Sequence, residues 1–342
     1  TYVATEIGKY PLASESMNCS APDTGNMEVL ERVGTEEQKK QWLEPLLNGE
    51  IRSAYAMTEP NLASSDAKNI STSAVLDGDE WVINGEKFYI SGAGDPRCKI
   101  MIVMVKTSPD AHPSKQQSQI LVPKDTPGVQ ILEGMQVFGH DHAPHGHMHI
   151  KFDNVRVPKE NILLGEGRGF EISQVRLGPG RIHHCMRWIG MCERAFTLMC
   201  ERAISRELED GVYLSDKQTI QNWIAESRAE INAARLLVKE TAMKIDSLGA
   251  SNARAEISII KFYCANVLQK VVDYAIYDER LGKSHWAVPG PDGDYGFGGH
   301  CLPKDLSAII NQFETLGLLE AVEQVNDQVR EDRDWEKMKG RA

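Results

Sequence analysis

The run Tyr55-Ala-Met-Thr-Glu-Pro-Asn-Leu-Ala-Ser-Ser-Asp66 is the most informative stretch of this chain of 342 residues. It leads from an apolar, strand-like entry through a turn at Glu59-Pro60-Asn61 to small hydroxyl side chains and one carboxylate. A turn of this kind leaves backbone N–H groups and short hydroxyls free to meet a flat polar ligand. The alternative is a purely structural β-turn.

Outward from this run, residues 51 to about 158 contain short β-rich segments separated by turn residues, among them Asn84-Gly85. The spacing of these segments predicts a compact β domain, a barrel or a sandwich. The segments are Glu80–Asn84, Lys99–Val105, Ser118–Val122, Gly128–Leu132 and His147–Phe152.

Helical patterns flank the β-rich region on both sides. Residues 1 to about 50 read as helical, with Thr35 as an N-cap before the acidic turn Glu36-Glu37-Gln38. Later helices are expected over Phe170 to Ala203, where Gly178-Pro179-Gly180 could break the helix, and over Asp216 to Leu248 and Ala253 to Ile276. Long helices with short connections predict an antiparallel bundle.

Composition excludes several classes of protein. A formal net charge of −11 argues against a nucleic-acid binder, because no basic stripe is present to neutralise phosphates. No apolar run reaches the roughly 18 residues of a membrane-spanning helix. Seven scattered cysteines without CxxC spacing predict reduced thiols in an intracellular protein. The chain begins without Met, and we expect residues upstream of it to be missing.

Several motifs together resemble the acyl-CoA dehydrogenases, and in particular their member 11-like, long-chain branch. The resemblance covers about residues 1–276. It implies an α+β fold with the end of an N-terminal helical domain at 1–50, a middle β domain at 51–160 and an incomplete C-terminal helical bundle at 161–276. The motifs are Asn18–Glu28, Gly34–Leu47, Ala56–Pro60 with Ala63–Asp66, Val155–Asn161, Gly165–Ile172 and Arg176–Arg187.

The resemblance implies FAD-dependent oxidation of a long-chain acyl-CoA to the trans-2-enoyl-CoA, with an electron-transfer flavoprotein as the partner that reoxidises the flavin. It also implies a homodimer or homotetramer, cytoplasmic in a bacterium and mitochondrial or peroxisomal in a eukaryote. Ser65 would lie where FAD meets the acyl-CoA, and Arg206 would reach a flavin in a neighbouring subunit. The FAD-binding residues would be Tyr55, Ala56, Met57, Thr58, Glu59, Ser64, Ser65, Tyr89, Ile90, Ser91 and Arg206, and the substrate-binding residues Ser65, Arg176, Gly178, Gly180 and Arg181.

The family reaction also needs a carboxylate that removes the α-proton of the thioester. In this branch the base lies in a C-terminal segment that is not recognisable here, and the other family position aligns with about Gly180, which has no side chain. The catalytic residue therefore stays unknown. An inactive remnant or fusion that binds FAD and acyl-CoA is the alternative to an active dehydrogenase.

Residues from about 277 to 342 resemble a different family, the catalytic-cysteine segment of UDP-glucose 6-dehydrogenase. The resemblance rests on Ser284–Asp294 and Gly296–Asp305, and implies Cys301 as a nucleophile beside Lys304 and Asp305. No GxGxxG follows a predicted strand, so a nicotinamide-binding domain is not evident. An NAD-dependent UDP-glucose dehydrogenase is the weaker alternative.

Two groups of histidines have both a functional and a structural interpretation. The cluster His140, His142, His145, His147 and His149 invites a metal site but has no clear carboxylate or cysteine partner, and we expect His147 and His149 to face solvent from a strand. His183-His184 on the first long helix is interpreted as packing.

Overall fold

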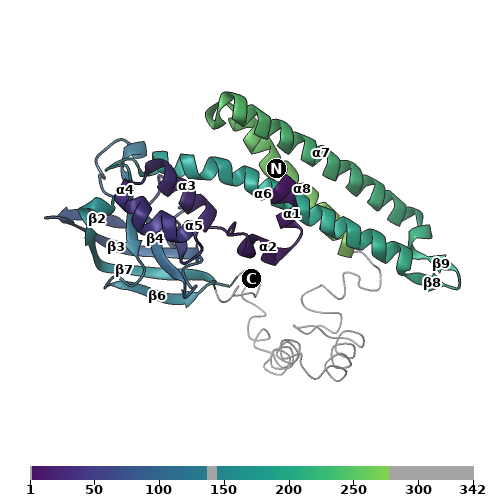
Figure 1. Ribbon diagram of the computed structural model, residues 1–342, viewed down its shortest axis with the longest axis horizontal. Coiled ribbons are helices and arrows are strands. Elements are labelled where there is room, and N and C mark those ends of the chain that lie inside the picture. The colour runs from purple at the N-terminus through teal and green to yellow at the C-terminus, as the bar shows by residue number, and fades with distance from the viewer. Residues whose placement is uncertain (1, 137–144, 277–342) are drawn as a thin grey trace, which may run out of the picture. The chain divides into compact units, whose positions relative to one another are not determined.

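The computed structural model describes residues 2–136 and 145–276 (Figure 1). These residues divide into two compact units. Unit 1 contains residues 2–193, with the gap at 137–144, and residues 231–266. Unit 2 contains residues 194–230 and 267–276.

Short helices open unit 1. Thr35 begins α4 with the predicted cap: its hydroxyl accepts a hydrogen bond from the Gln38 amide, and the Gln38 side chain accepts one from the Thr35 amide at 3.0 Å. The side-chain amide of Gln38 also donates to the Glu160 carbonyl at 2.8 Å, which ties this helix to the sheet. The helices are α1 (Tyr2–Gly8), α2 (Pro11–Ser16), α3 (Asp23–Val33), α4 (Glu36–Gln38), the π-helical η1 (Lys39–Leu43) and α5 (Glu44–Leu47).

The middle of unit 1 is a seven-stranded sheet in the order β1-β4-β2-β3-β7-β6, with β5 paired to β4. The β1–β4 pairing is parallel, and β3–β7 and β4–β5 are antiparallel. The strands are β1 (Arg52–Ala56), β2 (Ser73–Asp77), β3 (Glu80–Ser91), β4 (Cys98–Lys106), β5 (Gln117–Pro123), β6 (Val129–Gly134) and β7 (His147–Pro158), with single turns at η2 (Pro113–Lys115) and η3 (Lys159–Asn161).

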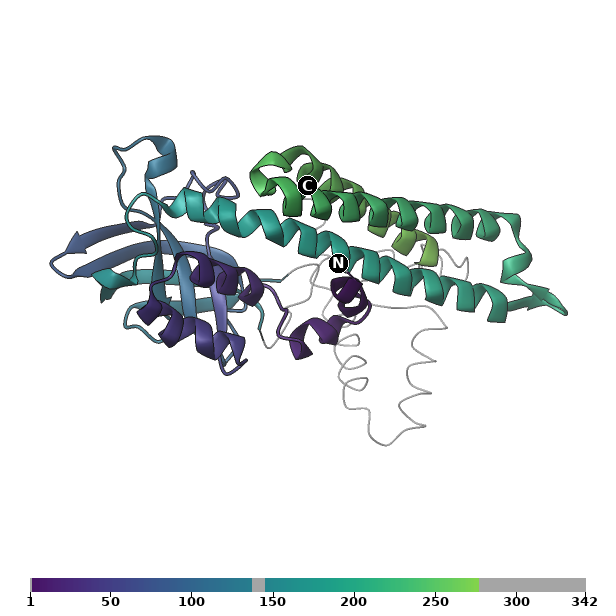
Figure 2. The same ribbon diagram turned by 45° about the horizontal axis from the view of Figure 1, so that its top comes forward.

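Strand β4 is buried on both faces because each face meets a different part of the core. Met101 and Val103 belong to a cluster with β3, β5 and β7, whereas Ile100 and Ile102 pack with α3, η1 and α5. Successive side chains of a strand point to opposite faces, so one apolar run can fill two layers. Figures 1 and 2 both show α3 and α5 lying over this sheet.

One sequence expectation about the sheet is wrong, and one strand was not predicted. Asn84-Gly85 is not a turn: β3 continues through it to Ser91, with a register shift at Ile83/Gly85. Gly85 has φ +148°, and the glycine serves a β-bulge in the pairing of β3 with β7. A Cβ there would lie 2.6 Å from the hydroxyl oxygen of Thr72, just before β2. Strand β2 was not among the predicted segments, because its alternation is weak and Val75 and Leu76 are exposed.

The long helices follow the predicted pattern except at one point. α6 (Gly169–Ser205) runs without a break through residues 178–180. Ile172 and Ile182 are buried on either side, and their packing outweighs the backbone hydrogen bond lost at Pro179. The remaining elements are β8 (Glu207–Glu209), β9 (Val212–Tyr213), η4 (Leu214–Asp216), α7 (Gln218–Leu248), η5 (Ala250–Asn252) and α8 (Arg254–Ile276).

Unit 2 is held by contacts between α7 and α8. Trp223 stacks on Tyr274 with ring centroids 5.1 Å apart, and Lys270 pairs with Glu230 at 2.7 Å. No helix in the described parts of either unit has the length and apolarity needed to cross a membrane. The predicted α+β fold, with helices before and after a middle β domain, is confirmed.

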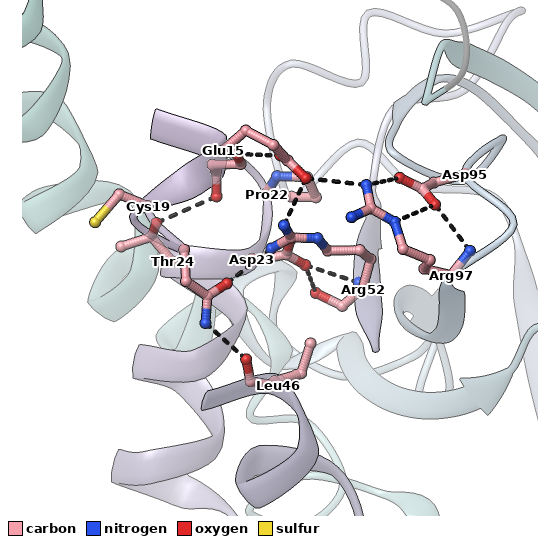
Figure 3. Close-up of polar contacts among 12 residues, drawn as sticks. Glu15, Cys19, Pro22, Asp23, Thr24, Leu46, Arg52, Asp95 and Arg97 are labelled. Carbon is pink, nitrogen blue, oxygen red and sulfur yellow. Dashed lines mark hydrogen bonds and ion pairs between the residues drawn. The ribbon is translucent and has the colours of Figure 1, made fainter. Parts of the chain in front are cut away.

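A buried charge network fixes α2 and α3 to the sheet (Figure 3). Arg52 of β1 contacts Asp23 at 3.4 Å and Glu15 at 2.5 Å. Asp23 in turn accepts hydrogen bonds from the amide and hydroxyl of Ser53 at 2.7 and 2.6 Å. Burial raises the pKa of Asp23, whereas the hydrogen bonds from Ser53 and the charge of Arg52 lower it. This carboxylate therefore depends on its partners to stay ionised.

Candidate functional site

The turn after β1 is closed by one of the predicted cofactor residues. Ser64 is buried, and its hydroxyl oxygen accepts a hydrogen bond from the Glu59 amide at 2.6 Å. Its proton has carbonyl acceptors within the same loop, at Glu59 and Leu62. The neighbouring Ser65 is exposed. The loop therefore uses the hydroxyl of Ser64 and leaves that of Ser65 accessible to a ligand.

The structure brings the two predicted flavin segments together. The Phe88 amide donates to the Thr58 carbonyl at 3.0 Å, and the Thr58 hydroxyl donates to the Phe88 carbonyl at 2.7 Å. Tyr89 follows with φ +55° and a side chain that is 43 % exposed, while Ile90 is buried in the sheet core. A left-handed conformation at a non-glycine residue is strained and clusters at binding sites.

Beneath this junction lies a buried ion pair. Lys87 donates to Glu59 at 2.8 Å and to the Met57 carbonyl at 2.9 Å. Burial opposes ionisation of Glu59, but Lys87 and hydrogen bonds from Ser71 and Thr72 outweigh it and hold the pKa of Glu59 at about 2. Burial also lowers the pKa of Lys87 to about 8, against the attraction of Glu59.

Tyr55 connects the sheet to α6. Its hydroxyl lies 3.1 Å from the Ser173 hydroxyl and accepts a hydrogen bond from Gln119 at 3.0 Å. The Arg176 guanidinium stacks on the Tyr55 ring, 4.0 Å from its centroid, and donates to Asn26 at 3.2 Å. Burial raises the pKa of Tyr55, so the phenol stays protonated.

A cavity of about 540 Å³ within unit 1 adjoins this contact. It contains three of the predicted substrate residues, Arg176, Gly180 and Arg181, and Gly178 lies on α6. The described lining residues are Val3, Ala4, Ile7, Cys19, Ala21, Pro22, Thr24, Gly25, Glu28, Arg176, Gly180, Arg181, His183, His184, Met186, Arg187 and Lys261.

The cavity is predominantly cationic and contains neutral histidines. Burial lowers the pKa of His183, and burial with Arg187 and Lys261 lowers the pKa of His184 to about 4. Arg187 lies 3.2 Å from His184 Nδ1 and can only donate, so Nδ1 accepts and the imidazole N–H is on Nε2. Glu28 is the only acidic residue among the lining residues, and its Oε2 has no hydrogen-bond partner among the described residues.

Sequence reasoning missed Glu28 and Lys261 and assigned His183-His184 to packing. Close backbone approach builds this wall: a Cβ on Gly8 or Gly190 would collide with the backbone of the facing helix, so α1 and α6 touch directly. The glycines at positions 8 and 190 are a sequence signal for this close contact between helices, because a glycine within a helix often marks tight packing.

Other predicted residues lie elsewhere. Arg206 follows the end of α6 in unit 2, and its Nε has no partner among the described residues. His147 and His149 do not face solvent freely: His147 Nδ1 lies 2.8 Å from the Ser91 hydroxyl, and His149 Nε2 lies 3.1 Å from Glu86. No metal-binding cluster occurs in residues 2–136 and 145–276. His140, His142, Cys301, Lys304 and Asp305 lie outside the described residues.

Family comparisons match both halves of this site. Residues 54–155 match the acyl-CoA dehydrogenase middle domain, and residues 167–277 match the acyl-CoA dehydrogenase C-terminal domain. Residues 259–328 match the central domain of the UDP-glucose/GDP-mannose dehydrogenase family, as the second resemblance predicted. This match and the match to the acyl-CoA dehydrogenase C-terminal domain overlap within α8.

Individual relatives agree with these matches. Acyl-CoA dehydrogenase family member 11 of Mus musculus is 51 % identical over 277 residues, which is 80 % of this chain and 35 % of that protein. The human protein of the same name is 53 % identical over 276 residues, with the same two shares, 80 % and 35 %. The chain thus spans about a third of the length of these curated relatives.

A solved structure extends the likeness to most of the chain. An acyl-CoA dehydrogenase homologue from Mycobacterium abscessus shares 40 % identity and a TM-score of 0.78, covering 98 % of this chain and 78 % of that one. Glutaryl-coenzyme A dehydrogenase, at 24 % identity and a TM-score of 0.70, shares the fold. These matches show that the chain belongs to the acyl-CoA dehydrogenase family.

Proposed function

We propose that this protein is an FAD-dependent oxidoreductase that converts a long-chain acyl-CoA to the trans-2-enoyl-CoA. The observation that carries the proposal is that one segment makes both contacts: Thr58 pairs with Phe88, and Tyr55 stacks against Arg176 of the cavity wall. It supports a flavin and a thioester lying side by side. Bound FAD would supply the acceptor for the hydride that leaves the β-carbon of the substrate.

The residues at the junction suit a flavin. A flavin presents carbonyl and N–H groups along one edge and needs a few donors in a mostly apolar slot. The Thr58 hydroxyl already donates to Phe88, so its oxygen is left to accept. Ser65 and Tyr89, in the two predicted flavin segments, are exposed. Arg181, an exposed residue at the cavity wall, would suit a phosphate of CoA because its fork donates bidentately.

This proposal assigns no residue as the catalytic base. Gly180 lines the cavity without a side chain, which favours the second candidate, a protein that binds FAD and acyl-CoA but does not turn over. As further proposals from the family, an electron-transfer flavoprotein would accept the electrons, and the protein would assemble as a homodimer or homotetramer.

A visible absorption spectrum of the purified, FAD-supplemented protein tests both candidates. Anaerobic addition of a long-chain acyl-CoA should bleach the flavin band if the dehydrogenase is complete. A Glu28→Gln variant then asks whether the carboxylate of the cavity wall takes the α-proton. A flavin band that persists would support the inactive candidate, and a protein that binds no FAD would exclude both.

The match of residues 259–328 favours one other activity, NAD-dependent oxidation of UDP-glucose with Cys301 as nucleophile. Formation of NADH from UDP-glucose, followed at its absorption band, tests it. No NADH after prolonged incubation would exclude this activity and leave the two flavin-binding candidates.

A further inference from the structure

The ion pair between Glu59 and Lys87 is one of the most deeply buried in the described chain. Lys87 is 0 % exposed and Glu59 is 2 % exposed. The Glu59 carboxylate accepts hydrogen bonds from the Ser71 amide at 2.9 Å, the Ser71 hydroxyl at 2.5 Å and the Thr72 amide at 2.9 Å. The pair thus joins the turn after β1, the segment leading into β2 and strand β3.

The second hydrogen bond of Lys87 fixes the orientation of the peptide group between Met57 and Thr58. Its ammonium group donates to the Met57 carbonyl, which therefore points into the interior. In a trans peptide the C=O and the following N–H point in opposite directions. The Thr58 N–H must therefore point away from Lys87.

The Thr58 amide is left without a partner on that side. The Thr58 carbonyl and hydroxyl are both bonded to Phe88, but no described residue accepts a hydrogen bond from the Thr58 N–H. An unmet amide donor in a half-buried position is costly unless a ligand or water meets it. The donor lies at the junction where the proposed function requires an edge of the flavin.

We propose that Glu59 and Lys87 are a positioning pair, which holds the Met57 carbonyl inward and so presents the Thr58 N–H outward to a flavin carbonyl. This inference rests on the proposed function, since it takes FAD as the ligand. Packing alone does not account for the two charges, because an apolar pair of similar volume is often as stable in a protein interior.

The experiment compares FAD binding with folding in four forms of the full chain. These are the wild type, K87M, the double variant E59Q/K87M, and the control D23N/R52M, which removes another buried ion pair of unit 1. For each apoprotein the FAD dissociation constant is measured by flavin fluorescence, together with the thermal midpoint. The reduction potential of the bound flavin is then measured for each form.

K87M should raise the dissociation constant about tenfold, the effect of one lost hydrogen bond. The double variant should regain most of the thermal midpoint, because no buried charge is left unpaired, but it should keep the weakened FAD binding. Its flavin potential should fall, because a donor that favours the electron-rich reduced flavin is lost. The control should lower the midpoint and leave FAD affinity unchanged.

Wild-type affinity and potential in E59Q/K87M would overturn the positioning role. An equal loss of affinity in D23N/R52M would also overturn it, since the effect would then be one of general stability. If K87M does not fold, the double variant alone still decides the question. A wild-type chain that binds no FAD is a separate result, which overturns the proposed function itself.

Discussion

Glu28 is the residue whose surroundings make the sharpest electrostatic prediction. Burial lowers the pKa of His183, and the Glu28 carboxylate partly opposes that shift. Glu28→Gln removes the opposing charge while keeping the shape, so the pKa of His183 should fall further. Titration of the imidazole by NMR, in wild type and variant, measures the change.

Glu31→Gln is the matched control for this prediction. Glu31 lies on the same helix, α3, but is exposed and is not part of the cavity wall. Its replacement should leave the His183 titration close to that of the wild type. An unchanged titration in Glu28→Gln would mean that the carboxylate points away from His183 in solution.

Glu59 predicts a particular loss of stability in acid. Its pKa is about 2 in the folded chain, below the ordinary value of 4.5. A lowered carboxyl pKa stabilises the fold above the unfolded value, by about 3 kcal/mol here, and this contribution is lost as pH falls from about 4.5 through 2. Urea unfolding at pH 6 and pH 3 should therefore show a decrease to which Glu59 contributes about 2 kcal/mol.

The variant Glu59→Gln isolates that contribution. It should be less stable than the wild type at neutral pH, because Lys87 is left buried without its counter-charge. Its stability should then fall less steeply between pH 6 and pH 3. An equal loss of unfolding free energy between pH 6 and pH 3 in the two proteins would count against an ionised, stabilising Glu59.

At the scale of elements, strand β4 was predictable and the bulge in β3 was not. An uninterrupted apolar run such as that in β4 identifies a strand covered on both faces. Asn84-Gly85 has the local chemistry of a hairpin turn, but the decisive contact comes from Thr72, which lies just before β2. A pattern within one segment cannot distinguish a turn from a bulge when a neighbouring strand makes the difference.

Gly85→Ala tests this reading of the bulge. The new Cβ would meet Thr72 in a backbone conformation that L-residues rarely adopt, so the variant should lose about 2 kcal/mol or more of unfolding free energy. Gly78→Ala is the control, with φ +64° but nothing within 4 Å of its Cβ, and should lose about 1 kcal/mol. Similar losses in the two variants, measured by urea unfolding, would argue against the contact with Thr72.

The candidate site was predictable only in part, for a similar reason. The segments around Thr58 and Ser91 are motifs within single stretches, so resemblance could predict a flavin contact for both. The cavity wall instead combines Glu28 of α3 with Lys261 of α8, and only the folded chain brings them together. Neither residue stands in a local pattern that indicates a ligand.

At the scale of the whole molecule, two family matches meet inside one helix. The buried positions Ile260, Cys264, Val267 and Val271 give α8 a continuous apolar stripe across this overlap. Cys301→Ser should leave FAD affinity unchanged, because the predicted flavin segments and the described lining of the cavity lie on other residues. Flavin fluorescence titration of the full chain measures this, and a weakened affinity would mean that the second match contributes to the flavin site.

The double role of Gln38 has a consequence for the protein over time. Its side chain accepts from Thr35 through the oxygen and donates to the Glu160 carbonyl through the nitrogen. Deamidation would leave a carboxylate that can still cap the helix but has no proton to give to Glu160. This slow chemical modification would place a carboxylate oxygen of residue 38 against the Glu160 carbonyl oxygen, with no proton between them. Their repulsion would loosen the helices from the sheet without altering any residue of the site.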